Sequence, residues 1–433
     1  MASLAACVLL TLAAGCAGAP PRSFAAPGWF AMAPTREVVR VRGWPSGPMP
    51  LSFAIKAGGT VYASGLAGFD MRAKRLVPGG VAAETAQALR NLEEVMTAAG
   101  GSLHGVAGCS VLLRNMSRDF QAMNRAYAAF WPEEPPSRVA VQVGALQGEA
   151  SVEIQCTAAM PGYGRSVVHV PGIPELKGFP LSLGVQADGM VYASGMQGMD
   201  IPTKRLVDGG AAAETKKTLE NIDAILKAAG SGLDRSVSCE VSLRSMGDFG
   251  AMNAAYSAFW QQGGYPSRVA VQVADLAGKA AVEIRCLAAG QGLRREVVSV
   301  PGWPGLHGFP LSMGTVAGEV VYASGMQGMD MQAGKLVPGG VAEETRQALE
   351  NARAVFAAAG ARLEDALLCE VSLRDIKDVQ AMNEAYARFW PKDPPARFCV
   401  QAAGLAGRAA VEVRCLGLRA SVSGPGAAAE VLI

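Results

Sequence analysis

Histidine is nearly missing from this 433-residue sequence, which has three in all. His104, His169 and His307 occupy different places relative to the repeats described below, so we expect neither a shared histidine-based metal site nor a serine–histidine pair. Runs of lysine and arginine are also lacking, and 39 basic residues against 37 acidic residues leave a formal net charge of +2. Nucleic acid is therefore not an expected partner.

Cysteine pairs with metal-ligand spacing are lacking too, although the chain has nine cysteines. Six of them recur with the repeat, in apolar patterns typical of strands: Cys109, Cys239, Cys369, Cys156, Cys286 and Cys415. We expect buried free thiols that pack as small hydrophobic residues, and a disulfide within each repeat is the alternative. The Gly-x-x-Gly turn that starts at Gly65, with its copies, has no following lysine or helix start, so no phosphate loop and no cofactor are expected.

Long hydrophobic runs are limited to the N-terminus, where residues 4–14 are nearly all apolar. This run is too short to span a bilayer, and it is typical of a signal-type leader. Ser23-Phe24-Ala25-Ala26-Pro27 resembles the phenylalanine motif of two-part plastid-targeting leaders. We therefore expect secretory-route targeting, with the plastid as one destination and the cytoplasm or mitochondrion as alternatives, and no membrane span in the mature chain.

The rest of the chain repeats itself, because Val-Tyr-Ala-Ser-Gly begins at Val61 and returns at Val191 and Val321, 130 residues apart both times. This period is too long for solenoid units of about 20 to 50 residues and indicates duplicated domains. The expected organisation is a leader over 1–34, repeats over 35–163, 164–293 and 294–419, and a loose tail over 420–433.

Within the first repeat, hydrophobic periodicity predicts strands near 38–41, 51–55 and 60–64, then a helix over 82–99 that ends at Gly100. A strand over 109–113, a second helix capped by Asp119, and strands over 139–143 and 150–156 complete the unit. Tyr127 and its copies Tyr256 and Tyr386 lie on the apolar stripe of the second helix and are expected in the core. The order βββαβαββ favours an α+β fold, with a mixed sheet and both helices on one face.

Five motifs occur in the same order in every repeat: Ala-Ser-Gly, Glu-Thr-x-x-x-Leu-x-Asn, Asn-x-x-Tyr, Pro-x-Arg and Val-Glu-Ile/Val. In order and spacing they resemble the YjgF/RidA family of enamine and imine deaminases, and the resemblance covers nearly all of residues 35–419. It implies a chorismate-mutase-like fold and homotrimers with a cleft at each subunit interface. Three fused copies then imply an intrachain pseudo-trimer that acts as a monomer, with three clefts between repeats.

The resemblance assigns the chemistry to an arginine and to a glutamate fifteen residues later: Arg138 and Glu153, Arg268 and Glu283, Arg397 and Glu412. A guanidinium binds a carboxylate bidentately, so the arginine is expected to hold a small 2-imino acid. The glutamate is expected to orient or activate the water that attacks the imine carbon, which releases ammonia and a 2-keto acid without a cofactor.

Further cleft residues are implied by the resemblance, and they are Ser64, Ser194, Ser324, Asn124, Asn253, Asn383 and Cys399. The family's cysteine survives only as Cys399, because Ala140 and Ala270 replace it in the other repeats. A second departure is larger, since Leu51, Leu181 and Leu311 stand where family deaminases have a tyrosine.

Three function classes therefore stay open at this point, and two of them have support in the sequence. One is hydrolytic deamination of 2-aminoacrylate-like enamino and imino acids, and the other is a non-catalytic module of the same fold that binds or senses small carboxylates. Nothing basic or strongly apolar in the surface-prone segments supports a holdase or ribonuclease-like role.

Overall fold

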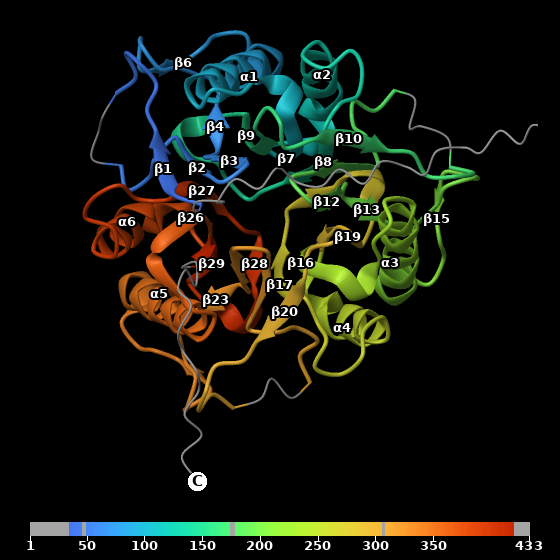
Figure 1. The fold of residues 1–433 in the computed structure, drawn as a ribbon, viewed down its shortest axis with the longest axis vertical. Coiled ribbons are helices and arrows are strands. Elements are labelled where there is room, and N and C mark those ends of the chain that lie inside the picture. Colours follow the sequence, from blue (N-terminus) through green and yellow to red (C-terminus); the bar gives the residue numbers. More distant parts are fainter. Residues whose placement is uncertain (1–33, 46–48, 174–177, 305–307, 420–433) are drawn as a thin grey trace, which may run out of the picture. The chain divides into compact units, whose positions relative to one another are not determined.

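The computed structural model of the chain describes residues 34–45, 49–173, 178–304 and 308–419 (Figure 1). The expected tail, and all of the expected leader except residue 34, lie outside these ranges. Three copies of one α+β unit follow one another along the chain, as predicted, and we name them the first, second and third repeats.

Besides two short 3-10 helices, the first repeat contains eleven α-helices and strands: β1 (Arg36–Val39), β2 (Ala54–Ala57), β3 (Thr60–Ala63), β4 (Leu66–Ala67), β5 (Phe69–Asp70), β6 (Arg75–Leu76), α1 (Gly80–Ala98), β7 (Val106–Leu113), α2 (Met116–Ala128), β8 (Ser137–Gln142) and β9 (Val152–Ala159). The sheet order is β1-β2-β3-β9-β7-β8, and β7 and β8 run parallel while the other pairs are antiparallel. The mixed sheet predicted from the sequence is therefore present. The two-residue strands β4, β5 and β6 were not predicted, because so short a segment carries no periodicity.

The second and third repeats have the same element order as the first, with one further two-residue strand each, β18 or β28, before the last strand. The second contains β10 (Arg165–Val168), β11 (Gly184–Ala187), β12 (Met190–Ala193), β13 (Met196–Gln197), β14 (Met199–Asp200), β15 (Arg205–Leu206), α3 (Gly210–Ala228), β16 (Ser236–Leu243), α4 (Phe249–Ser257), β17 (Ser267–Gln272), β18 (Asp275–Leu276) and β19 (Val282–Ala289). The third contains β20 (Arg295–Val298), β21 (Gly314–Ala317), β22 (Val320–Ala323), β23 (Met326–Gln327), β24 (Met329–Asp330), β25 (Lys335–Leu336), α5 (Gly340–Ala358), β26 (Ala361–Leu373), α6 (Val379–Ala387), β27 (Ala396–Gln401), β28 (Gly404–Leu405) and β29 (Val411–Arg419).

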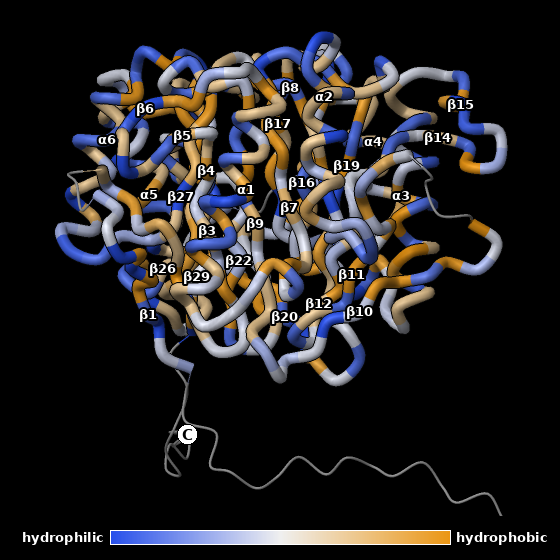
Figure 2. The backbone as a smooth tube through the Cα atoms, turned by 90° about the horizontal axis from the view of Figure 1, so that it is seen from above, coloured by the Kyte–Doolittle hydropathy of each residue, from blue (hydrophilic) through white to orange (hydrophobic). Residues whose placement is uncertain are grey.

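Helix packing follows the apolar stripes of the sequence. In α1 the buried residues Leu89, Leu92, Val95 and Met96 recur at helical spacing, and they join a core cluster with residues of β7 and β9. The predicted stop at Gly100 is confirmed, because this residue adopts a φ of 83° that favours glycine. Figure 2 shows hydrophobic segments along strands such as β4 and β17, while many peripheral turns are hydrophilic.

The start of α2 corrects one prediction. Asn115, not Asp119, caps the helix, because its side chain accepts a hydrogen bond of 3.0 Å from the backbone N–H of Arg118. Asp119 lies one turn further on and pairs with Arg118 at 2.7 Å. Both residues are good helix starters, and the sequence pattern alone did not place the first turn.

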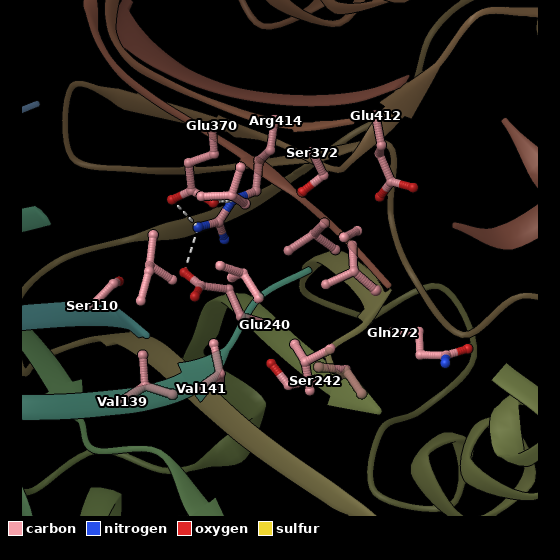
Figure 3. Close-up of a pocket in the computed structure, with 18 of the residues that line it drawn as sticks. Ser110, Val139, Val141, Glu240, Ser242, Gln272, Glu370, Ser372, Glu412 and Arg414 are labelled. Atoms are coloured by element: carbon pink, nitrogen blue, oxygen red, sulfur yellow. Dashed lines mark hydrogen bonds and ion pairs between the residues drawn. The ribbon is translucent and has the colours of Figure 1, made fainter. Parts of the chain in front are cut away.

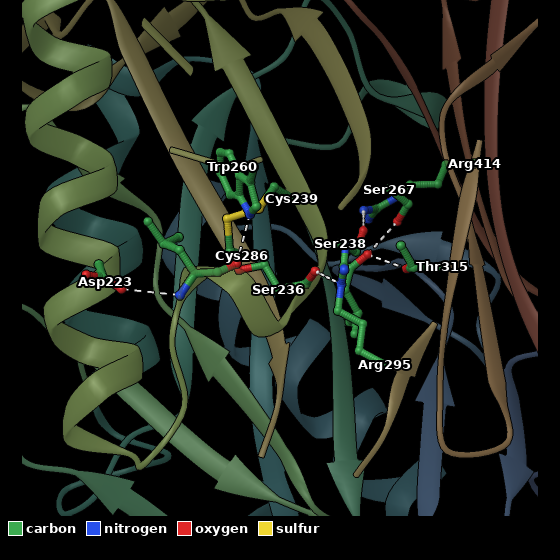
Figure 4. Close-up of a disulfide and its surroundings, with 12 residues drawn as sticks. Asp223, Ser236, Ser238, Cys239, Trp260, Ser267, Cys286, Arg295, Thr315 and Arg414 are labelled. Atoms are coloured by element: carbon green, nitrogen blue, oxygen red, sulfur yellow. Dashed lines mark hydrogen bonds between the residues drawn. A yellow bond between two sulfur atoms is a disulfide. The ribbon is translucent and has the colours of Figure 1, made fainter. Parts of the chain in front are cut away.

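The six repeated cysteines are not free thiols, so the first prediction for them is wrong and the alternative is correct. They form one disulfide in each repeat: Cys109–Cys156, Cys239–Cys286 and Cys369–Cys415. Each pair joins directly opposite residues of two antiparallel neighbours, for example Cys239 on β16 and Cys286 on β19 (Figure 4). The sequence separation of 46 or 47 residues hid this register, which only the strand pairing reveals.

The three repeats also contact one another in cyclic order. The short strand β18 of the second repeat pairs with β8 of the first, and β28 of the third pairs with β17 of the second. An isolated bridge between Ala145 and Gln401 joins the first repeat to the third in the same way. Each repeat thereby covers the edge strand of its neighbour, which would otherwise expose unpaired backbone groups.

Candidate active sites between the repeats

Each Pro-x-Arg arginine is buried on the last parallel strand of its repeat, where Arg138, Arg268 and Arg397 are all 2% exposed. Their guanidinium groups lie over the buried tyrosines Tyr127, Tyr256 and Tyr386 at 5.0, 5.0 and 4.9 Å from the ring centroids. The predicted core position of these tyrosines is confirmed, and the guanidinium groups of the arginines stack on their rings.

The Ser-Gly pair of the neighbouring repeat holds the backbone of each arginine from both sides. Ser194 Oγ accepts a hydrogen bond of 2.8 Å from the N–H of Arg138, and the N–H of Gly195 donates to the Arg138 carbonyl at 3.0 Å. The same contacts link Ser324 and Gly325 to Arg268, and Ser64 and Gly65 to Arg397.

The serine hydroxyl groups are therefore engaged on both sides. Ser64, Ser194 and Ser324 are at most 1% exposed, and each also donates to a backbone carbonyl at 2.5 to 2.6 Å. The sequence suggested that these serines contact the ligand, whereas the structure places their hydroxyl groups against main-chain atoms of the arginine. Their position makes them residues that fix the arginine across the boundary between repeats.

The arginine of one repeat faces the glutamate of the next, and not the glutamate fifteen residues later. The charge of Glu283 acts on Arg138, that of Glu412 acts on Arg268, and that of Arg397 acts on Glu153. We name these pairs the first cleft (Arg138 and Glu283), the second cleft (Arg268 and Glu412) and the third cleft (Arg397 and Glu153). The constant interval in the sequence therefore links residues that belong to different clefts.

The three glutamates are buried carboxyl groups with unusual titration. Glu153, Glu283 and Glu412 are 5 to 8% exposed, and burial raises the pKa of each to about 7 although the facing arginine opposes the shift. Such a carboxyl group exchanges its proton near neutral pH, which suits a general base. The glycine of each Ser-Gly pair makes room for it, because a Cβ at Gly65, Gly195 or Gly325 would overlap the carboxylate oxygen.

Two glutamines support two of the glutamates, and the sequence did not single them out. Gln197 Nε2 donates to Glu283 at 2.9 Å and Gln327 Nε2 donates to Glu412 at 2.8 Å. Both amides also donate to a backbone carbonyl, of Ala277 or Ala406. The sequence contains one signal for them, because the second and third repeats both have glutamine two residues after the Ser-Gly glycine, where the first repeat has Ala67.

The arginines have no carboxylate partner within the described residues. No ion pair joins Arg138, Arg268 or Arg397 to an acidic group of the described chain, and the Nε atom of each lacks a hydrogen-bond partner there. Burial lowers the pKa of Arg138 and of Arg268, because a cation without a partner is costly to remove from water. A ligand carboxylate would satisfy this donor set.

Of the three predicted asparagines, Asn383 alone is hydrogen-bonded to an arginine within the described chain. Asn124 and Asn253 each bury a side-chain oxygen that has no hydrogen-bond partner in the described chain. Asn383 accepts a bond of 2.7 Å from Arg397, so the third cleft uses this amide within the protein.

A cavity of about 470 Å³ opens beside Arg138 and Glu283 in the first cleft. Residues of both the first and the second repeat line it, among them Phe120 and Leu181. Leu181 stands where the resemblance would place a tyrosine, so this wall of the cavity is apolar.

No helix of the described ranges is long and apolar enough to cross a membrane.

Cys399 lies in the third cleft, as the sequence suggested, since the charges of Arg397 and Glu153 act on it. The side chain is 2% exposed, and burial raises the pKa of its thiol to about 12. The thiol therefore stays protonated at neutral pH and is not activated as a nucleophile.

A charged cluster that the sequence did not predict lies where the second and third repeats meet. Figure 3 shows Glu240 and Glu370 both pointing toward Arg414, and Arg285 pairs with Glu240 at 2.7 Å. Although burial raises the pKa of Glu240, the two arginines bring it down to about 2. These charges satisfy one another and stabilise the contact between repeats.

No group of three residues that could hold a metal ion occurs in the described parts of the chain.

Comparison with known proteins places three matches along the chain. A sequence model described as endoribonuclease L-PSP matches residues 45–160, 178–290 and 309–418. The RutC family protein UK114 of Drosophila melanogaster is 43% identical over 113 residues, which are 26% of this chain and 82% of that protein. The mouse 2-iminobutanoate/2-iminopropanoate deaminase is 40% identical over 123 residues, 28% of this chain and 90% of that enzyme. A solved structure of RidA from an Antarctic Psychrobacter is 35% identical, covers 29% of this chain and 99% of its own, and has a TM-score of 0.27.

Proposed function

Since the chain belongs to the endoribonuclease L-PSP family through all three of its repeats, we propose that it hydrolyses 2-imino acids and their enamine tautomers to 2-keto acids and ammonia without a cofactor. The observation that carries the proposal is the pair in each cleft. A buried arginine without an anionic partner faces, across the boundary between repeats, a carboxyl group with a pKa of about 7. Relatives named as 2-iminobutanoate/2-iminopropanoate deaminases support the reaction class.

The arginine binds the carboxylate of the imino acid through its unpaired N–H groups. This contact orients the imine carbon toward the glutamate of the next repeat. The glutamate, in its ionised form, takes a proton from a water molecule while the water oxygen attacks the imine carbon. The protonated glutamate then passes this proton to the imine nitrogen, which gives an amino alcohol. The glutamate next takes the hydroxyl proton of the amino alcohol and passes it to the amine, so that the carbonyl group forms, the carbon–nitrogen bond breaks, ammonia leaves and the glutamate is ionised again.

A coupled assay tests this proposal. An L-amino-acid oxidase generates the imino acid, and loss of the imine is followed against its spontaneous hydrolysis. We expect acceleration by the wild-type protein, and its loss in the Arg138→Ala/Arg268→Ala/Arg397→Ala variant, because the substrate carboxylate loses the buried cation that binds it in each cleft. Circular dichroism verifies the fold, and the corresponding Arg→Lys variant, which keeps the charge but not the planar fork, is expected to raise KM.

The second candidate is a module that binds small carboxylates without catalysis. The apolar Leu181 favours it, because this position in the cleft offers no hydroxyl group to the reacting centre. Binding of a 2-keto acid without any acceleration of imine loss, in a folded protein, would select this function over the deaminase.

We also propose that one chain works as a monomeric pseudo-trimer. The cyclic contacts between β18 and β8, between β28 and β17, and between Ala145 and Gln401 support this arrangement, because they pair these sheet edges of the described residues with a neighbouring repeat of the same chain. Light scattering coupled to gel filtration should give the mass of one chain, and three times that mass would reject the proposal.

For the compartment we propose the secretory route, with the plastid as one destination. Three disulfides, one in each repeat, support an oxidising environment, since cytosolic proteins seldom keep structural disulfides. Mass spectrometry of the native protein after alkylation of free thiols tests this, because alkylation of all six cysteines would argue for a reducing compartment.

A further inference from the structure

Three exposed apolar side chains occupy the same position in the three repeats. Phe179, Phe309 and Met49 each lie two residues before the leucine that replaces the family's tyrosine, and they are 47, 49 and 53% exposed. An apolar side chain that is half exposed gains little from folding. Its recurrence at one place suggests that a ligand covers it.

Phe179 belongs to the wall of the first cleft. The ring of Phe120, on α2 of the first repeat, lies 6.5 Å from the ring of Phe179 in the second repeat. Leu181, Met196, Met199 and Ile201 continue the apolar wall of the same cavity. Arg138 and Glu283 line the same cavity, as do the ion-paired Asp275 and Lys279, so the cavity combines charged groups with an apolar wall.

This arrangement fits one kind of molecule, with a carboxylate at one end and a large apolar group at the other. The cavity of about 470 Å³ lies within the range of sites that hold ligands larger than a three-carbon acid. A 2-imino acid with a methyl side chain would leave the apolar wall in contact with water. A side chain of the size of leucine, methionine or phenylalanine would cover it.

The second cleft carries the same elements and the third does not. Phe249 replaces Phe120, with Arg268 5.9 Å from its ring centroid, and Phe309 replaces Phe179. In the third cleft the two positions hold Val379 and Met49, so both aromatic rings are missing. Because of this difference, we expect the first and second clefts to cover a larger ligand side chain than the third cleft does.

We propose, on the basis of the function proposed above, that the first and second clefts select 2-imino acids whose side chain is bulky and apolar. The arginine binds the carboxylate, the glutamate faces the imine carbon, and the two phenylalanines cover the side chain. The substrates of these clefts are then the imino acids formed by oxidation of leucine-, methionine- or phenylalanine-type amino acids at the α-carbon.

The test compares imino acids that an L-amino-acid oxidase and dioxygen produce from alanine, leucine and phenylalanine. We expect kcat/KM for the two larger imino acids to exceed that for 2-iminopropanoate by about tenfold or more, since an apolar pocket discriminates by roughly this factor for each missing methylene group. In the Phe120→Val/Phe249→Val variant, which copies the third repeat, the ratio of phenylalanine-derived to alanine-derived activity should fall about tenfold. Tyr163→Val is the matched control, since Tyr163 is also exposed, at 49%, but does not line the cavity, and its ratio should equal that of the wild type.

The outcomes separate this inference from the proposed function. If 2-iminopropanoate is the fastest substrate and the double variant keeps the wild-type ratio, the side-chain inference is overturned while the deaminase stands. If no imino acid is accelerated, the deaminase fails, and titration calorimetry with the 2-keto acids decides the inference. Binding of 3-phenyl-2-oxopropanoate about tenfold tighter than pyruvate, weakened in the double variant, supports the apolar class, and equal or undetectable binding of both overturns it.

Discussion

The first two clefts and the third cleft share their central residues but differ in what surrounds them. In the first two, Gln197 or Gln327 donates to the glutamate. In the third, Ala67 takes that position, and Gln147, on the opposite loop, donates instead to the backbone carbonyl of Cys399 at 3.4 Å. No side chain of the described residues donates a hydrogen bond to Glu153.

The loops that precede the last strand of each repeat, which we name the rim loops, also differ between the third cleft and the other two. Lys279 and Arg408 occupy a left-handed position on the rim loop of the second and third repeats, and Glu149 occupies it in the first. The third cleft therefore has an acidic residue where the other two have a basic one, next to a site for an anionic ligand. Duplication thus kept the arginine, serine, glycine and glutamate in every repeat, while the supporting residues diverged separately.

The largest effect is expected from removal of the proposed bases. The Glu153→Gln/Glu283→Gln/Glu412→Gln variant should lose about 10² to 10⁴ of the catalysed rate, because an amide cannot take a proton from water. If the hydrogen bond from glutamine is worth about tenfold, Glu283→Gln/Glu412→Gln should retain about a twentieth of the rate and Glu153→Gln should lose only about a twentieth of it. If the double variant instead retains a third of the rate and Glu153→Gln loses a third of it, the three clefts contribute equally.

Stability is expected to change in the opposite direction to activity. Folding raises the pKa of Glu283 to about 7, so the folded state is favoured while the carboxyl group is protonated and loses that stability as the pH rises through 7. Glu283→Gln should therefore raise the free energy of unfolding by about 3 kcal/mol at pH 8 and leave it nearly unchanged near pH 4. Denaturant titration at the two pH values measures this.

The same measurement on Glu153→Gln sharpens the comparison of the clefts. Glu153 has no glutamine donor, so its ionised form is supported less than that of Glu283. Its stabilising effect at pH 8 should be at least as large as that of Glu283→Gln. A clearly smaller effect would mean that the third carboxylate has support that the comparison overlooks.

A moderate effect is expected from the glutamines, which are positioning residues. The hydrogen bond from Gln197 lowers the pKa of Glu283, so Gln197→Ala/Gln327→Ala should move the acidic limb of the kcat/KM profile to higher pH and reduce the rate at pH 7 about tenfold. Ala67→Gln is the reciprocal variant, and it should increase the contribution of the third cleft. A lower rate with no shift of the limb would indicate a loss of packing alone.

The smallest effect is expected from Cys399→Ala, which copies Ala140 and Ala270 of the other repeats. The thiol is buried and its pKa is raised to about 12, so no thiolate takes part near neutral pH. The rate should change by less than about twofold. A tenfold loss would show that the third cleft dominates catalysis through its cysteine and would invert the comparison.

Much of the fold was predictable because the repeat and its periodicities are local signals. The helix that ends at Gly100, the core tyrosines and the mixed α+β order all follow from spacing along one repeat. The cap at Asn115 and the three disulfides were not predicted correctly, because each depends on a register that neighbouring residues do not determine. Of the candidate site, the arginine and glutamate were named from motif resemblance, while Gln197 and Gln327 were overlooked.

The sequence by itself determined that three like domains follow one another, and which residues recur in all of them. It also determined that no cluster of basic residues or shared histidine site accompanies them. These properties can be read along one dimension, since they depend on residue type and on interval.

Only the tertiary structure decided which residues share a cleft. The interval in the sequence joins Arg138 to Glu153, but the buried guanidinium faces Glu283, because the site forms where strands of two repeats meet. The same packing places the Ser194 hydroxyl group against the backbone N–H of Arg138, although the sequence predicted that this serine contacts the ligand. Burial of a charge and the hydrogen bonds that satisfy it depend on neighbours in space, and those neighbours come from a different repeat.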